Sequence, residues 1–229
     1  VVGLERGQHG FALLAGGLAG RVTALMHTKL EIQPLLAGIL VMLGLYSVNL
    51  KIMGTRANIP LINKTTVFSL LDGTPLEEYA QLLIPLAILI ILLLLLFLFL
   101  KTKFGFALRA TGDNAQMVRA LGVNTDTTIL VGMALSNALV ALAGALLAQY
   151  QSFTDIGMGI GMVVIGLASV IIGEVVFGTR SLMRRLVAVT LGAMLYRMII
   201  AVALEMGMPA TDLKLVSATL VALALAMPV

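Results

Sequence analysis

Long apolar stretches, separated by short polar segments, make up most of the chain. A helix needs about 20 mostly apolar residues to cross the roughly 30 Å hydrocarbon core of a bilayer. The clearest stretch, residues 79–100, has no charged residue and includes the run LAILIILLLLLFLFL. The pattern predicts an all-α, polytopic transmembrane helical bundle of about seven spans, at residues 11–26, 32–50, 79–100, 127–154, 156–173, 186–206 and 215–229.

Composition supports a lipid environment for this bundle. Hydrophobic residues make up 60% of the 229 residues and charged residues only 11%, whereas soluble domains carry about 25% charged residues. We expect residues 1–229 to form a single transmembrane domain. Because the chain starts at Val1 and lacks the residue order of a signal peptide, we also expect a fragment without its true N-terminus and with one or more earlier helices missing.

Lysine and arginine collect preferentially in the cytoplasmic loops of membrane proteins. The short segment 179–185 carries three arginines and no acid, and the segment 101–126 is also rich in cations. We therefore place both segments in the cytoplasm, and the net charge of +4 reflects such loops rather than nucleic-acid binding. Residues 51–78 then form an extracytoplasmic, turn-rich loop, whose TTVFSLL portion is either a short strand or a surface helix.

The segment 101–126 contains the signals of a short helix. Asp113 is a suitable N-cap with Gln116 three residues later, residues 115–121 favour helix, and Gly122 suits the left-handed position that ends one. Met117, Val118 and Leu121 would form an apolar edge. Because so short a helix is marginal in water, it either packs on the bilayer or neighbouring helices, or inserts into a groove on a cytoplasmic partner.

The sequence FGFALRATGDNAQMVRALGVNTD resembles the cytoplasmic loop of ABC-transporter permeases of the branched-chain amino acid/ribose class. Residues 27–54, 57–61, 167–174 and 209–225 are similar to a subgroup of amino-acid or tryptophan/tyrosine uptake permeases, so the resemblance covers most of the chain. It implies that the loop helix is the coupling helix, which receives force from a separate ATP-binding subunit. The positions that the resemblance assigns to coupling are Arg109, Gly112, Asp113, Asn114, Arg119, Leu121 and Gly122.

The resemblance also implies partners: ATP-binding cassette subunits, a second permease subunit in a homo- or heterodimer, and an extracytoplasmic solute-binding protein. It places the chain in the lipid bilayer of a bacterial cell membrane. The chain has no G-x-x-x-x-G-K-[ST] phosphate loop, no cysteine and only two histidines, far apart. We therefore predict no catalytic residues, no metal and no cofactor.

Charged residues at bilayer depth require a partner or an aqueous cavity, and Arg21, Glu174, Arg197 and Glu205 are the candidates. Glu174 either gates the path through an ion pair or extends to water at the interface. Arg197 either meets a carboxylate of the solute or pairs with an acid of the protein. Asn137 is a third pathway candidate, although Asn137, Ser136 and Gln149 also suit hydrogen bonds across helices.

Two glycine patterns favour helix packing over ligand binding. They are Gly16-x-x-x-Gly20 and Gly157-x-Gly159-x-Gly161, of which the second could also break its helix. The sequence as a whole predicts the permease subunit of an ATP-driven importer for a small solute, an amino acid or related compound. A secondary transporter driven by an ion gradient is the alternative.

Overall fold

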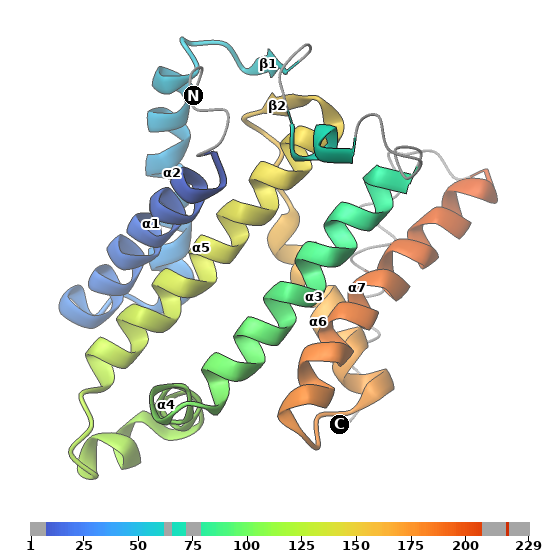
Figure 1. Cartoon of the computed structure of the whole chain (residues 1–229). Coiled ribbons are helices and arrows are strands. Elements are labelled where there is room, and N and C mark those ends of the chain that lie inside the picture. Colours follow the sequence, from blue (N-terminus) through green and yellow to red (C-terminus); the bar gives the residue numbers. More distant parts are fainter. Residues whose placement is uncertain (1–7, 62–65, 72–78, 208–218, 220–229) are drawn as a thin grey trace. The chain divides into compact units, whose positions relative to one another are not determined.

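The part of the chain that the structure describes is helical apart from one two-stranded sheet and the connecting turns (Figure 1). The computed structural model describes residues 8–61, 66–71, 79–207 and 219. In these residues the elements are α1 (Gln8–Leu30), α2 (Pro34–Ile52), β1 (Asn58–Pro60), the 3-10 helix η1 (Val67–Leu71), α3 (Ala80–Lys101), α4 (Lys103–Ala120), α5 (Thr125–Gln151), β2 (Phe153–Asp155), α6 (Met162–Phe177) and α7 (Leu182–Glu205). The all-helical prediction is confirmed.

Four helices, α2, α3, α5 and α7, are long and apolar enough to cross a membrane. Helix α6 is apolar but shorter, at 16 residues. Helix α1 covers the first predicted span but carries Arg21 and Lys29, which lower its apolar character. The predicted seventh span, residues 215–229, lies outside the described residues apart from Thr219.

Large apolar side chains cover the outside of the helices. Leu82, Ile90 and Leu94 on α3 are all more than half exposed, whereas the buried apolar residues are mainly alanines such as Ala24, Ala37, Ala168 and Ala188. A lipid solvent explains this distribution, because hydrocarbon tails accept leucine as readily as a protein core does and helices then associate through small residues.

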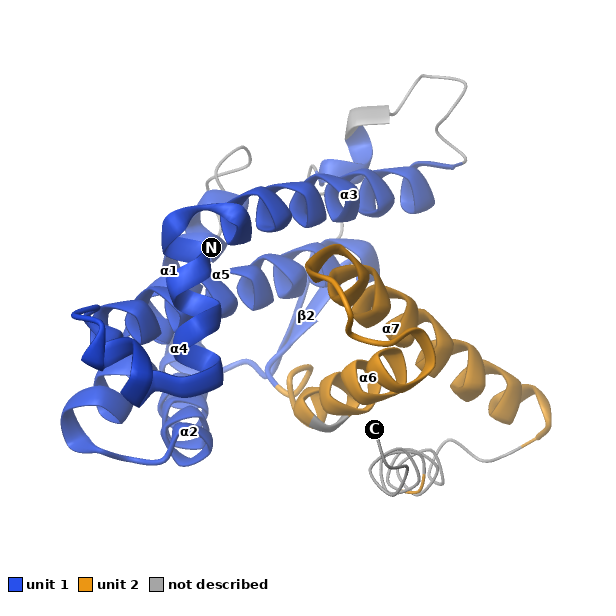
Figure 2. Ribbon diagram, turned by 90° about the horizontal axis from the view of Figure 1, so that it is seen from below, with its two compact units in different colours: residues 1–156 blue, residues 157–229 orange. Residues whose placement is uncertain are grey.

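The chain divides into two compact units, Val1–Ile156 and Gly157–Val229, coloured blue and orange in Figure 2. In the first unit, α1 packs along α5 through two glycines of α1. A Cβ at Gly16 would lie 2.5 Å from the Asn137 carbonyl oxygen, and one at Gly20 would lie 2.4 Å from the Met133 carbonyl oxygen. The predicted packing role of Gly16-x-x-x-Gly20 is confirmed.

The predicted outer loop is tied to the end of α5. Strand β1 pairs antiparallel with β2, with Ile59 opposite Thr154, a sheet that the sequence did not indicate. Within the TTVFSLL segment, Val67–Leu71 forms the 3-10 helix η1, so of the two predicted alternatives the strand is wrong for these residues. The Val67 N–H donates to the side-chain oxygen of the buried Gln149 (2.9 Å), which confirms a cross-element role for that glutamine.

In the second unit, α6 and α7 cross at glycines. A Cβ at Gly173 would lie 2.2 Å from the Ala188 carbonyl oxygen, and one at Gly192 would lie 2.2 Å from that of Ser169. Among the described residues, Gly159 and Gly161 have no neighbour within 4 Å of a built Cβ, so the predicted packing role of the Gly157-x-Gly159-x-Gly161 pattern is wrong there at its last two positions. The segment forms turns, and Gly161, with φ +84°, precedes the first residue of α6.

Candidate functional site

The polar segment that follows α3 begins with a sharp corner at Thr102. Its hydroxyl donates to the Phe99 carbonyl at the end of α3 (2.7 Å) and accepts the Gly105 N–H at the start of α4 (3.1 Å). Gly105 permits this corner, because a Cβ there would lie 2.5 Å from the Leu100 Cα. Residues 103–113 are therefore helical, which the sequence reading missed.

Helix α4 is interrupted at Asn114, whose backbone is extended (φ −156°, ψ 93°). The Asn114 side-chain oxygen accepts the Met117 N–H (3.0 Å), the bond that an N-cap makes to the third residue of a helix. The prediction that Asp113 is the cap is wrong by one residue. Asp113 ends the preceding helical segment, and only Asn114 has the extended backbone that aims a side chain at the next turn.

The short helix that follows, residues 115–120, ends as predicted at Gly122. The Gly122 N–H donates to the Arg119 carbonyl (3.0 Å), and the Val123 N–H donates to the Val118 carbonyl (3.3 Å). This is the Schellman arrangement. It requires a left-handed residue, and Gly122 has φ +84°.

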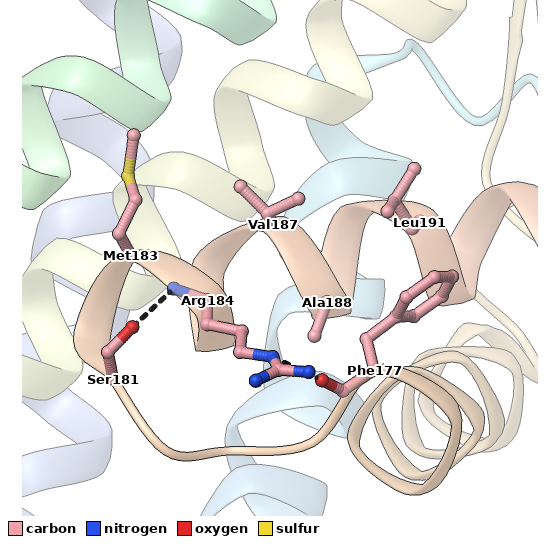
Figure 3. Close-up of a pocket in the computed structure, with 7 residues that line it drawn as sticks. All are labelled: Phe177, Ser181, Met183, Arg184, Val187, Ala188 and Leu191. Atoms are coloured by element: carbon pink, nitrogen blue, oxygen red, sulfur yellow. Dashed lines mark hydrogen bonds between the residues drawn. The ribbon is translucent and has the colours of Figure 1, made fainter.

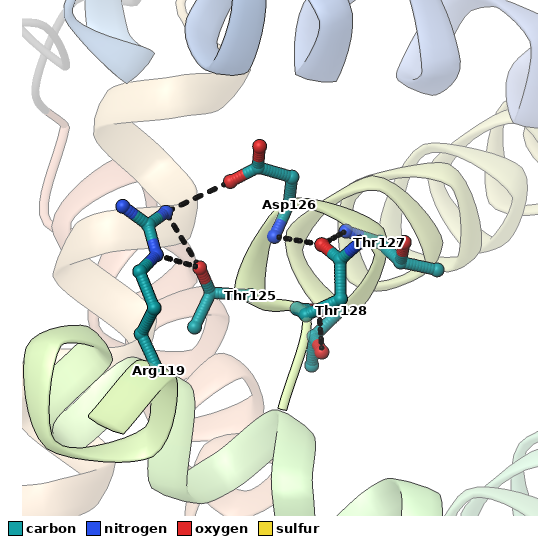
Figure 4. Close-up of polar contacts among 6 residues, drawn as sticks. Arg119, Thr125, Asp126, Thr127 and Thr128 are labelled. Carbon is teal, nitrogen blue, oxygen red and sulfur yellow. Dashed lines mark hydrogen bonds and ion pairs between the residues drawn. The ribbon is translucent and has the colours of Figure 1, made fainter. Parts of the chain in front are cut away.

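Arg119 links the short helix to the first turn of α5 (Figure 4). Its Nε and Nη2 donate to the Thr125 hydroxyl oxygen (3.0 and 2.7 Å), and Nη2 also pairs with Asp126 Oδ1 (2.9 Å). An exposed ion pair contributes only about 0–1 kcal/mol. Thr125 is 1% exposed, so its hydroxyl oxygen is shielded from water and the bonds from Arg119 are the larger contribution.

The first turn of α5 is itself fixed by Asn124. The Asn124 side-chain oxygen accepts the N–H groups of Asp126 (3.1 Å) and Thr127 (3.2 Å). The Thr128 hydroxyl donates to the Asn124 carbonyl (2.9 Å). Thr125 and Asp126 were missed by sequence reasoning, although an asparagine followed by a polar, acidic first turn is a recognisable helix start.

The apolar edge predicted for the short helix is divided between the interior and the surface. Val118 is 3% exposed, whereas Met117 is 51% and Leu121 73% exposed. Arg109, earlier on α4, is exposed and lies over the Phe106 ring (5.6 Å to its centre). The short helix, held by caps at both ends, therefore exposes two apolar side chains and several polar ones.

The predicted pathway residues belong to different units: Asn137 to the first, and Glu174 and Arg197 to the second. The Asn137 side-chain nitrogen donates to the Met133 carbonyl of its own helix (3.0 Å), so the hydrogen bond seen for it in the described residues lies within α5. Glu174 follows Gly173, which contacts Ala188. Arg197 lies nine positions after Ala188 on α7, or about 14 Å along the helix. Within the described residues neither Glu174 nor Arg197 forms an ion pair.

The turn between α6 and α7 carries a shallow, mainly apolar pocket of about 370 Å³ (Figure 3). Ser181 caps α7 by accepting the Arg184 N–H (3.3 Å), and the Arg184 Nε donates to the Phe177 carbonyl (2.6 Å). The arginine thus closes the turn. Across the described part of the chain, no three His, Cys, Asp or Glu side chains are grouped as a metal site requires.

The apolar spans and the capped polar segment between α3 and α5 together define a multi-pass membrane protein. Residues 9–226 match the family model described as the permease component of branched-chain amino acid transport systems. The chain belongs to this family of ABC importer permeases, which work with ATPase and solute-binding partners.

Several curated relatives are similar over most of the chain. A tyrosine transport system permease protein of Clostridioides difficile is 42% identical over 92% of this chain and 68% of its own length. An uncharacterised protein of Rickettsia prowazekii is 33% identical over 90% of this chain and 73% of its own length. An autoinducer 2 import system permease protein of Yersinia pestis is 30% identical over 87% of this chain and 55% of its own length. No solved structure matches significantly.

Proposed function

We propose that residues 115–122 form the coupling helix of an amino-acid importer and dock in a groove of the ATPase subunit on the cytoplasmic side. The single observation that carries this proposal is the exposure of Met117 and Leu121 on a helix whose ends are fixed by Asn114 and Gly122. Two apolar side chains presented by a capped helix are the anchors of helix-in-groove recognition.

The test removes the two anchors. Met117→Ser combined with Leu121→Ser should abolish co-purification with the ATPase subunits and solute-stimulated ATP hydrolysis, because an apolar groove then has nothing to bury. Met206→Ser is the matched control, since Met206 is an exposed methionine (81%) at the end of α7, in the other unit of the chain. Normal co-purification with the ATPase subunits and normal solute-stimulated ATP hydrolysis in the double variant would contradict the proposal.

The solute proposed is an amino acid with an aromatic side chain, on the strength of the Clostridioides difficile relative. Arg197 supports a solute with a carboxylate: it is exposed in the middle of α7, where a cation needs a counter-charge or water. In this proposal two permease subunits, identical or related, enclose the path.

Transport assays separate this role of Arg197 from a structural one. With the complete importer, Arg197→Gln should reduce tyrosine uptake but leave the much weaker uptake of tyramine, which lacks the carboxylate, unchanged. Arg197→Lys should restore part of the tyrosine uptake. Equal losses for both solutes would assign Arg197 to the protein's own stability, and absence of tyrosine uptake in the unsubstituted importer would overturn the proposed solute.

A further inference from the structure

Arg119 has a position that the coupling proposal alone does not explain. The family resemblance groups it with residues that meet the ATPase. Its guanidinium nevertheless reaches the first turn of α5 (Figure 4), although the side chain stays 67% exposed. Three contacts hold it there: two hydrogen bonds to Thr125 and the ion pair with Asp126.

The two ends of the short helix are attached differently to the rest of the first unit. Toward α3, the helical conformation is interrupted at a single extended residue, Asn114. Toward α5, the tight turn at Gly122 and the Arg119 contacts join it to the first turn of α5, which Asn124 caps with two more bonds. The short helix is therefore hinged on the α3 side and fixed on the α5 side.

Helix α5 is in turn packed closely against α1. The two backbones touch at Gly16 and Gly20, where no room remains for even a methyl group. Close-packed helices shift as rigid bodies rather than compress. A displacement of the short helix would therefore move α5 and α1 together. The extended backbone at Asn114 would absorb the bend toward residues 103–113, which contact α3 at Gly105 and α5 through Leu108 at Gly132.

We propose that Arg119 is a positioning residue that locks the coupling helix to α5, so that ATPase motion enters the membrane through the α5–α1 pair and not through α3. The inference rests on the proposed function for the claim that force comes from the ATPase. The contacts of Arg119 with Thr125 and Asp126 are a property of this chain alone. Arg119 acts through Thr125 and Asp126 and needs no contact with the ATPase.

Spin labels test the lock directly, because the chain has no cysteine of its own to interfere. Cysteines replace Gln116 on the short helix, Val140 on α5 and Ile90 on α3, three exposed positions of the first unit. The distance distribution between labels at 116 and 140 should be narrow in the parent protein and should broaden in Arg119→Gln and in Thr125→Val. Lys103→Gln, which removes another exposed cation of α4, should leave it narrow.

The complete importer supplies the functional readout. Arg119→Gln should still assemble with the ATPase, but the ATP consumed per solute should rise by about two- to thirty-fold, the range for substitutions that weaken coupling. Arg119→Lys keeps the ion pair but not both bonds to Thr125. Its ATP consumption per solute should therefore lie between those of the parent importer and Arg119→Gln. Nucleotide binding should change the 116–90 distance and leave the 116–140 distance unchanged.

An unchanged 116–140 distance distribution in Arg119→Gln would overturn the lock. If that variant also failed to assemble with the ATPase, Arg119 would be a contact residue instead. If the unsubstituted importer shows no ATP-driven uptake, the proposed function fails. The label distances in the isolated chain still decide whether Arg119 holds the helix to α5.

Discussion

At the scale of single residues, glycine is required where another backbone occupies the space of a Cβ. Gly20 of α1 faces the Met133 carbonyl and Gly105 faces the end of α3, each closer than any side chain tolerates. Gly17 is adjacent to this contact but not part of it, since its nearest neighbour would be 3.9 Å from a built Cβ. Neighbouring glycines of one helix therefore differ in their tolerance to substitution.

This difference predicts the result of adding one methyl group to α1. Gly20→Ala should lower the free energy of unfolding by about 1–3 kcal/mol, the usual cost of overpacking, because α1 and α5 must separate. Gly17→Ala, in ordinary contact, should be neutral or slightly stabilising, since alanine favours helix. Thermal unfolding in detergent measures both, and equal effects of the two substitutions would contradict the close approach at Gly20.

At the scale of elements, α4 is two helical segments with different supports. The segment 103–113 is attached to α3 through Thr102 and Gly105, whereas the short helix 115–120 depends on its caps and on Val118. Six helical residues are far too few for a stable isolated helix. The caps therefore decide whether this element exists.

Asn114→Ala removes the N-cap and should destabilise the short helix by about 0.5–2 kcal/mol. Amide hydrogen exchange at residues 117–121 should accelerate, while exchange in the middle of α5 stays unchanged. Asp113→Ala is the control, since Asp113 does not supply the cap. Faster exchange in the Asp113 variant, with none in the Asn114 variant, would restore the original assignment of the cap.

At the scale of the whole molecule, the exterior is apolar and the energy source lies in another polypeptide. Family membership indicates ATP-driven import over transport driven by an ion gradient. Vesicles that contain the complete importer should therefore lose uptake when ATP is depleted and keep it when ionophores collapse the proton and sodium gradients. Uptake by vesicles that contain this chain alone, abolished by an ionophore, would identify a secondary transporter instead.

The sequence by itself determined the four long spans at α2, α3, α5 and α7 and the position of the polar segment between α3 and α5. Span length and lipid exposure depend only on local composition, so residues 79–100 could be assigned without any tertiary information. The helix end at Gly122 could likewise be predicted from the sequence, because a glycine that ends a short helix requires no distant partner.

Tertiary structure decided the features in which distant or competing groups meet. The side chains of Asp113 and Asn114 are equally good caps in sequence, and only the backbone at residue 114 selects the second. The pairing of β1 with β2 joins segments that lie far apart along the chain. Arg119 could have faced a partner or its own chain; the fold directs it to the buried hydroxyl of Thr125, because an isolated polar group there would be costly.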